Sequence, residues 1–303
     1  MTRAIALDVG GTYIKGGVAD EDGVLRESER WSTGAERGPD AVLETVLAAA
    51  RELADRHRPS VAGIAVPGIV DETAGTVILA ANLGWRRLPV RDRLAEELGL
   101  PVALGHDVRA GGLAEARIGA GRGSRAFLFV PVGTGIAAAL IADGRTMTGS
   151  HARAGELGHL VVRTGGDACP CGGRGCLETV ASAAAVARRY AVATGEDGVT
   201  AKDVGERAAA GDEAAVAVWN EAIDALADAL AAAITLFDPE RIVIGGGLSR
   251  AGDPYFTPLR AAVAERLTFQ TLPDIVPADL GHEAGCQGAA LLAHDLLQRK
   301  AGR

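Results

Sequence analysis

The sequence has few aromatic residues, few cysteines and no excess of positive charge, and each shortage excludes a class of protein. Aromatic residues make up 4% of the 303-residue chain, so its cores must rely on the Ala, Val, Leu and Ile that dominate a 48% hydrophobic content. The 39 acidic residues outnumber the 31 Lys and Arg residues, giving a formal net charge of −8. Such a chain lacks the basic surface that binds phosphate backbones, so we expect no nucleic-acid partner.

Long apolar segments are also missing. The longest uncharged run, residues 126–142, contains Pro131 and a Gly-Thr-Gly turn and is too short to span a bilayer comfortably. The N-terminus lacks the apolar run of a signal peptide, because Asp8 and a glycine pair interrupt it. We therefore expect a cytoplasmic protein without a membrane partner, which acts on a small ligand or on another protein.

Strand and helix patterns alternate along the chain, which is typical of an α/β fold. The length favours two domains of ordinary size, closely joined because no long linker separates the patterns. We predict strands over residues 3–9, 13–19, 61–66, 102–104, 241–244 and 274–277, and helices over 39–57, 90–98, 181–193, 201–210, 213–237, 256–267 and 284–298.

Two parts of the chain share one pattern, in which a strand, a glycine-threonine turn, a second strand and an acidic turn follow one another. Val9-Gly10 and Ala19-Asp20 in the first part correspond, at the same spacing, to Val132-Gly133 and Ala142-Asp143 in the second. The matching order of elements carries more weight than these few identities. It predicts two halves built on one plan.

Three of the four cysteines lie close together in the chain. Cys169, Cys171 and Cys176, with His159 upstream, supply the number and type of ligands that a tetrahedral zinc site needs, and the glycines among them allow a tight loop. Reduced thiols, or a disulfide with a spare thiol, are the alternatives. A site closed by four protein ligands would be structural. The isolated Cys286 is predicted to be a core residue.

Glycine turns after predicted strands indicate a nucleotide site. The first, Asp8-Val-Gly10-Gly11-Thr12, offers backbone N–H groups to phosphate oxygens and a carboxylate to Mg²⁺, although a plain Gly-Gly hairpin would look the same. Gly133-Thr134-Gly135 is a second such turn. The glycine run that includes Gly246 and Gly247 gives a third place where a nucleotide could approach the backbone.

These motifs resemble the ROK group of sugar kinases and regulators, within the actin-like ATPase superfamily, over nearly the whole chain. The Gly155-Glu-Leu-Gly-His159 element followed by the cysteine loop is the most specific match. The resemblance rests on Asp8-Val-Gly-Gly-Thr12, Val66-Pro-Gly68, His106-Asp107, Gly133-Thr-Gly135, Gly155-Glu-Leu-Gly-His159, the segment from Cys169 to Glu178, and Ile244-Gly-Gly-Gly247.

The resemblance implies a two-domain, ribonuclease-H-like α/β fold with an interdomain cleft and a zinc loop. The domain boundaries that we predict are 1–109, completed by helix 284–303, and 110–283. ATP with Mg²⁺ would lie at the glycine turns, where Lys15 takes the place of a lysine that similar kinases carry nearer the turn. The sugar would lie in the cleft, and a homodimer or homotetramer is expected.

Carried over by position, Asp107 resembles the general base that acts on the attacking hydroxyl, although an Asp there also suits a helix N-cap before Val108. The chain differs from the family pattern at His106, where similar kinases usually have Asn, and at Arg109, where a small polar residue is common. Without the resemblance, Glu156 and Glu178 would read as surface charges or loop caps. The implied sugar-binding residues are Gly68, Asn82, His106, Asp107, Glu156, His159 and Glu178.

The function implied is that of an ATP-dependent hexose kinase that phosphorylates the 6-hydroxyl of an aldohexose, either glucose or N-acetylglucosamine. An N-acetylmannosamine kinase and a glucokinase that uses polyphosphate are alternatives. A non-catalytic, sugar-responsive regulator is a further alternative, but regulators of this group carry a helix-turn-helix ahead of the first glycine turn, and Asp8 leaves no room for one.

Overall fold

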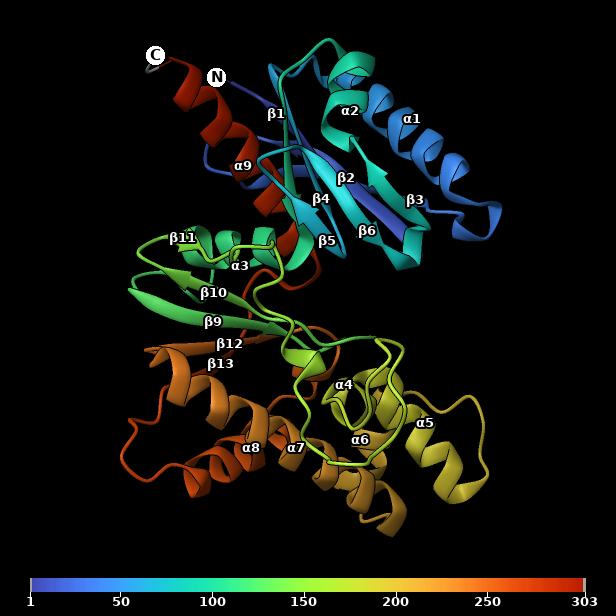
Figure 1. Ribbon diagram of the computed structural model, residues 1–303, viewed down its shortest axis with the longest axis vertical. Coiled ribbons are helices and arrows are strands. Elements are labelled where there is room, and N and C mark those ends of the chain that lie inside the picture. Colours follow the sequence, from blue (N-terminus) through green and yellow to red (C-terminus); the bar gives the residue numbers. More distant parts are fainter. Residues whose placement is uncertain (1, 302–303) are drawn as a thin grey trace. The chain divides into compact units, whose positions relative to one another are not determined.

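The predicted alternation of strands and helices is present in the computed structural model, which describes residues 2–301 (Figure 1). The strands are β1(Ala4–Val9), β2(Tyr13–Ala19), β3(Leu25–Ser32), β4(Val61–Val66), β5(Ile69–Asp71), β6(Thr76–Ala80), β7(Trp85–Leu88), β8(Val102–His106), β9(Ala126–Pro131), β10(Ala139–Ala142), β11(Arg145–Thr146), β12(Arg241–Gly245) and β13(Asp274–Pro277). The helices are α1(Pro39–His57), α2(Val90–Leu98), α3(Asp107–Ile118), α4(Glu178–Ala181), α5(Ala183–Thr194), α6(Ala201–Ala209), α7(Glu213–Phe237), α8(Asp253–Arg266) and α9(Ala284–Ala301).

The chain divides into two compact units. The first comprises Met1–Arg122, Arg145–Ala154 and His282–Arg303, and the second comprises Gly123–Gly144 and Gly155–Gly281. The predicted boundaries, 1–109 with 284–303 and then 110–283, differ from this division because all of α3 belongs to the first unit. The α3 helix packs closely on α9, which keeps both helices in the same unit.

The first unit is built on a mixed sheet with the strand order β3-β2-β1-β4-β8. β1 runs antiparallel to β2 and parallel to β4, and β4 runs parallel to β8. The helices α1 and α2 cover one face of this sheet, and α9 covers the other with small residues such as Ala289 and Ala290 (Figure 1). The continuous apolar pattern of the central strands β1 and β4 and the apolar faces of α1 and α2 explain why the limits of these elements could be predicted closely.

The strands β3, β5, β6 and β7 of the first unit were not predicted, and neither was the two-residue β11. The sequence of β3, LRESERWS, is polar, and most of its side chains are exposed. The strands β5, β6 and β7 are short and form a separate antiparallel sheet. Edge strands and small sheets of this kind lack the continuous apolar pattern that identifies a central strand.

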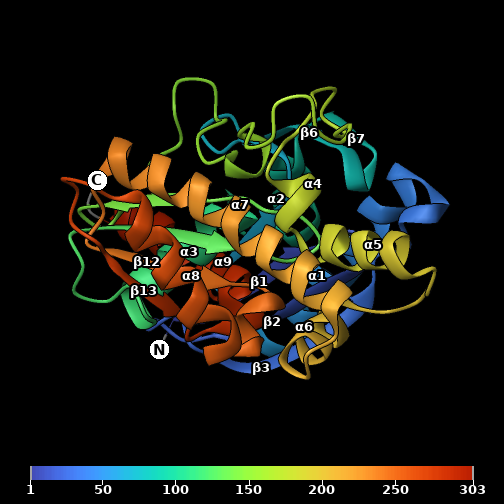
Figure 2. The same cartoon turned by 90° about the horizontal axis from the view of Figure 1, so that it is seen from below.

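The second unit repeats the plan of the first. Its strands follow the order β10-β9-β12-β13, which corresponds to β2-β1-β4-β8, with β9 antiparallel to β10 and parallel to β12. The long helix α7 lies beside α8, as Figure 2 shows, and its apolar side packs into the larger core. The prediction of two halves with one topology is therefore confirmed.

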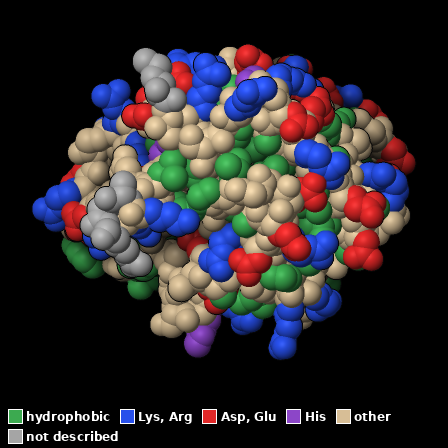
Figure 3. Space-filling view, turned by 90° about the horizontal axis from the view of Figure 1, so that it is seen from above, with side chains coloured by type: hydrophobic (Ala, Val, Ile, Leu, Met, Phe, Trp, Pro, Cys, Tyr) green, Lys and Arg blue, Asp and Glu red, His purple; other side chains and the backbone are tan. Residues whose placement is uncertain are grey.

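No helix in residues 2–301 is both long enough and apolar enough to cross a bilayer. The face in Figure 3 carries basic and acidic side chains next to one another. Arg26–Asp22 and Arg51–Glu97 are exposed ion pairs of the first unit.

Close contact between α3 and α9 yields a prediction for stability. A Cβ atom at Gly288 would lie 2.0 Å from the backbone oxygen of Ala110, so the two helices must separate to accept any side chain. We expect Gly288→Ala to lower the free energy of unfolding by about 1–3 kcal/mol. Arg299→Ala, on an exposed position of the same helix, is the control. Equal melting temperatures for the two variants in a thermal melt would contradict this packing.

Candidate active site

The first glycine turn is the connection between β1 and β2. The Gly10 N–H donates to the Tyr13 oxygen at 2.9 Å, and the Thr33 hydroxyl donates to the Gly10 oxygen at 2.7 Å. Within residues 2–301, the N–H groups of Gly11 and Thr12 have no backbone partner. The sequence analysis proposed the N–H groups of Gly10, Gly11 and Thr12 as phosphate donors. The Gly10 N–H is already bonded, whereas those of Gly11 and Thr12 are available.

Asp8 lies at the end of β1 with 15% of its side chain exposed, and its carboxylate is 3.6 Å from the Lys15 Nζ. Burial raises the pKa of Asp8 to about 6; Lys15 opposes this shift and the charge of Asp107 adds to it. A Cβ atom at Gly285 would come within 2.7 Å of the Asp8 carboxylate, so only glycine leaves room for it. A carboxylate beside a turn with free N–H groups fits Mg²⁺ and phosphate.

Lys15 is committed to contacts within the first unit. Besides its ion pair with Asp8, its Nζ donates to the His282 backbone oxygen at 3.0 Å. The side chain therefore offsets the charge of Asp8 in this structure. Its predicted contact with phosphate stays a prediction.

Asp107 begins α3, directly after His106 at the end of β8. The predicted helix cap is corrected here: His106 is the N-cap, because its Nδ1 accepts a hydrogen bond from the Arg109 N–H, and the helix starts at Asp107 rather than Val108. The Asp107 Oδ1 accepts from the Val108 N–H at 2.7 Å. Burial raises the pKa of Asp107, opposed by that hydrogen bond and by the charges of Arg109 and Lys15.

Gly68 and Asn82 flank the small sheet of the first unit. Gly68 has a φ of 94°, and a Cβ atom there would lie 2.1 Å from the Leu79 oxygen, so this glycine is needed for the β5–β6 packing. The Asn82 Cβ lies about a van der Waals contact from the Cβ position of Gly11. The structure thus brings Asn82 to the proposed phosphate-binding turn. Packing between β5 and β6 alone explains why position 68 is a glycine.

The two glycine turns of the second unit lie side by side. The Val132 N–H donates to the Gly245 oxygen at 3.0 Å, and a Cβ atom at Gly246 would lie 2.2 Å from the Val132 oxygen. Gly133 and Gly247 have open space where a side chain would be. The predicted nucleotide-contacting glycines of this unit therefore form one surface.

Glu178 connects the Gly133–Gly135 turn to the cysteine loop. Its Oε2 accepts from the Ile136 N–H at 2.8 Å, directly beside Gly135. One oxygen of this predicted sugar ligand therefore already holds the turn. Glu156 lies near the cysteine loop, with its Oε2 3.9 Å from the His159 Nε2.

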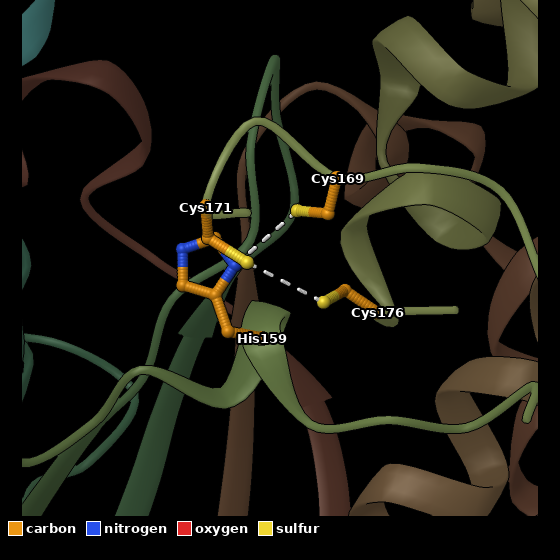
Figure 4. A group of neighbouring side chains, drawn as sticks. All are labelled: His159, Cys169, Cys171 and Cys176. Carbon is orange, nitrogen blue, oxygen red and sulfur yellow. Dashed lines mark hydrogen bonds between the residues drawn. The ribbon is translucent and has the colours of Figure 1, made fainter. Parts of the chain in front are cut away.

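The four predicted zinc ligands converge on one point (Figure 4). The Sγ atoms of Cys171 and Cys176 are 3.7 Å apart, and the Cys169 Sγ is 3.6 Å from the His159 Nδ1. Tetrahedral zinc with Zn–S bonds of about 2.3 Å separates its sulfur ligands by about 3.8 Å. A disulfide would require about 2.05 Å between sulfurs. The cluster is therefore compatible with zinc and is not disulfide-bonded.

The remaining cysteine behaves as predicted. Cys286 is 1% exposed on α9, and its thiol donates to the Ala6 oxygen at 3.4 Å. It lies in the small core between α9 and the first sheet.

Sequence reasoning missed Glu72 and Gly285. Glu72 contacts both His106 and Arg109, but it follows a short strand that carries no strong signal. Gly285 is one of the 41 glycines of the chain, and no local pattern distinguishes it from a helix glycine of no consequence.

A family profile and the similarity to known proteins agree with this geometry. The profile of the ROK family matches residues 4–296. The chain belongs to the ROK family. A glucokinase of Thermotoga maritima is 35% identical over 304 residues, which cover 95% of this chain and 96% of the relative. An N-acetylmannosamine kinase of Citrobacter koseri is 33% identical, covering 95% of this chain and 98% of its own length.

Solved structures of the family share the fold. The ROK glucokinase of Streptomyces griseus, in complex with glucose and AMPPNP, has a TM-score of 0.86 at 32% identity, covering 97% of this chain and 99% of its own. The ROK hexokinase of Thermus thermophilus also has a TM-score of 0.86, at 33% identity, covering 98% of this chain and 100% of its own. The predicted actin-like α/β fold is thereby confirmed.

The cysteine cluster yields a prediction about metal content. We expect the protein, purified without chelators, to hold one zinc ion per chain, measured by mass spectrometry of the metal. Cys171→Ser should lose most of the zinc and lower the melting temperature, because the loop then lacks a ligand that ties it together. Cys286→Ala is the control, since it removes a thiol outside the cluster and should leave the zinc content unchanged. Zinc-free wild-type protein would contradict the site.

Proposed function

We propose that the chain is an ATP-dependent hexose kinase that phosphorylates the 6-hydroxyl of an aldohexose, either glucose or N-acetylglucosamine. The observation that carries this proposal is that the first unit holds two partly buried carboxylates, Asp107 at the start of α3 and Asp8 beside its glycine turn, and that the charge of Asp107 helps to raise the pKa of Asp8. Asp107 is suited to accept the proton of a hydroxyl, and Asp8 is suited to hold the metal ion of a metal-bound phosphate. The named activities of the glucokinase relatives and the glucose and AMPPNP of the related complex support it.

Asp107 has the properties of a general base. Its Oδ1 is held by the Val108 N–H, while Oδ2 has no hydrogen-bond partner within residues 2–301. The free oxygen can take the proton of the attacking hydroxyl. A raised pKa makes the carboxylate a better proton acceptor near neutral pH than an ordinary aspartate.

The phosphate-binding groups are backbone N–H donors. Gly11 and Thr12 supply them in the first unit. In the second, the Gly133 N–H is already bonded to the Gly135 oxygen at 3.0 Å, so the exposed backbone of Thr134 and Gly247 is proposed to supply them. ATP with Mg²⁺ provides the phosphoryl group and neutralises its charge, and Asp8 would hold the metal directly or through water. Phosphoryl transfer depends on such positioning more than on covalent help from the protein.

The sugar-binding groups are proposed to be Asn82, His106, Glu156, His159 and Glu178. Zinc at the His159 Nδ1 would fix the ring and leave Nε2 as an oriented donor, with Glu156 nearby. Glu178 contributes through its remaining oxygen, because Oε2 is bonded to the turn. We further propose that the protein acts in the cytoplasm as a homodimer or homotetramer.

A panel of sugars tests the substrate. Glucose, N-acetylglucosamine, N-acetylmannosamine and galactose are each supplied with ATP, and ADP release is followed in a coupled assay. We expect turnover to be fastest with glucose or N-acetylglucosamine. Absence of turnover with every sugar, together with sugar-dependent binding to a DNA fragment, would replace the kinase with a regulator.

Replacing the base tests the mechanism. We expect Asp107→Asn to lower kcat by about 10²–10⁴-fold while sugar still binds, because the carboxamide keeps the shape but accepts no proton. In the wild type, kcat/KM should fall as the pH drops through a pKa above that of an ordinary aspartate, since protonated Asp107 is inactive. Arg122→Gln, outside the site, is the control. Wild-type turnover in Asp107→Asn would reject this role.

A further inference from the structure

A buried cation beside the proposed base has no role in the mechanism above. Arg109 is 3% exposed, and its Nε donates to the Glu72 Oε1 at 2.8 Å. A second donor of the guanidinium reaches the Val70 backbone oxygen at 3.3 Å. Burying a charge is costly unless the charge is paired and hydrogen-bonded. The bonds from Arg109 to Glu72 and to the Val70 oxygen offset this cost.

The pair contacts His106 from two directions. The Glu72 Oε1 that binds Arg109 also accepts from the His106 backbone N–H at 3.2 Å. The backbone N–H of Arg109 in turn donates to the His106 Nδ1 at 3.4 Å. One carboxylate therefore ties the loop between β5 and β6 to the junction of β8 and α3, where Asp107 begins.

These contacts determine which nitrogen of the His106 ring carries the proton. A backbone N–H can only donate, so Nδ1 must present its lone pair and the neutral ring carries its hydrogen on Nε2. Nε2 has no hydrogen-bond partner within residues 2–301, and 11% of the side chain is exposed. The ring thus presents a single donor away from the helix.

The ring is also kept neutral. Burial, and after it the charge of Arg109, lowers the pKa of His106 to about 3, opposed by Glu72. The Asp107 Oδ1 also lies 3.4 Å from Nδ1, but this oxygen already accepts from the Val108 N–H at 2.7 Å, so the Arg109 N–H is the hydrogen-bond partner of Nδ1. An asparagine carboxamide could turn either its oxygen or its nitrogen outward, whereas His106 can only donate.

We infer that Glu72 and Arg109 are positioning residues, which hold His106 as a fixed hydrogen-bond donor to one sugar hydroxyl and so determine selectivity at that carbon. This inference rests on the proposed kinase function. His106 precedes Asp107, which takes the 6-hydroxyl. In a hexopyranose, C5 carries the ring oxygen, so the nearest hydroxyl to the 6-hydroxyl is that on C4. His106 therefore donates to the 4-hydroxyl oxygen.

Glu72 offers two variants that differ in severity. It lines a cavity of about 660 Å³ together with Thr73 and residues 148–153, so truncating it adds to space that already exists, and the cost of Glu72→Ala comes from the buried Arg109 charge that it leaves unpaired. Glu72→Gln keeps an oxygen that can accept from Arg109 and His106, whereas Glu72→Ala removes it. Thr73→Ala, an exposed neighbour on the same loop, is the matched control.

Kinetics with glucose and 4-deoxyglucose test the positioning role. In the wild type, we expect kcat/KM for 4-deoxyglucose to be at least about 10²-fold lower than for glucose, because its binding leaves the His106 donor unpaired. Glu72→Ala should reduce this ratio to within about tenfold and raise KM for glucose far more than it lowers kcat. Glu72→Gln should restore most of the selectivity, and Thr73→Ala should match the wild type.

Nitrogen NMR of the histidine ring gives a readout that is independent of turnover. The His106 signals, assigned by their loss in His106→Asn, should show the Nε2–H form and no titration between pH 5 and 8, while Glu72→Ala should show a mixture of the two neutral forms. An Nδ1–H ring, or unchanged sugar selectivity in Glu72→Ala, would overturn the inference alone. Absence of turnover with every sugar in the wild type would overturn the proposed function itself.

Discussion

The close approach of α9 to the first sheet and to α3 is the constraint on which the proposed active site depends. Three positions on this contact accept no side chain: a Cβ at Gly63 would lie 1.9 Å from the Ala289 oxygen, one at Gly288 would meet Ala110, and one at Gly285 would meet the Asp8 carboxylate. Because these backbones touch, Asp8 at the end of β1 and the start of α3 are held in one rigid arrangement. The chemistry of the first unit thus depends on glycines that carry no chemical group themselves.

In the second unit, glycines at close contacts hold the turns proposed to bind the nucleotide. A side chain at Gly246 would collide with the Val132 oxygen, and one at Gly135 would come within 2.5 Å of the Glu178 carboxylate. The first contact brings two glycine turns together, and the second lets an acid from the cysteine loop accept a hydrogen bond from the turn. The loop that the cysteines hold is therefore connected through Glu178 to the backbone proposed to bind the nucleotide.

The sequence predicted what depends on local pattern and missed what depends on pairing across the fold. The limits of α1, α2 and α7 were predicted to the residue, because their apolar faces and their neighbours are encoded locally. The zinc ligands could be found because four residues of two uncommon types, His and Cys, lie close in the chain. Glu72 could not be found, because its partners His106 and Arg109 lie 34 and 37 residues away in the chain. The helix cap was missed for another reason: the bond between His106 and the Arg109 N–H is local, but Asp caps helices more often than His does, so Asp107 was expected to cap a helix that His106 caps instead.

The distribution of charge in the first unit explains why Asp107, of its three site carboxylates, is suited to accept a proton. Glu72 is bonded to the Arg109 guanidinium, and Asp8 is paired with Lys15. Asp107 has no Lys or Arg within 4.0 Å in the described part of the chain, and the nearest ring nitrogen belongs to a neutral histidine. A cation in direct contact would hold the carboxylate in its ionised form and weaken it as a base. Because the Arg109 guanidinium is bonded to Glu72 and not to Asp107, its charge lowers the pKa of Asp107 less than burial raises it, and the carboxylate stays a better base than an ordinary aspartate.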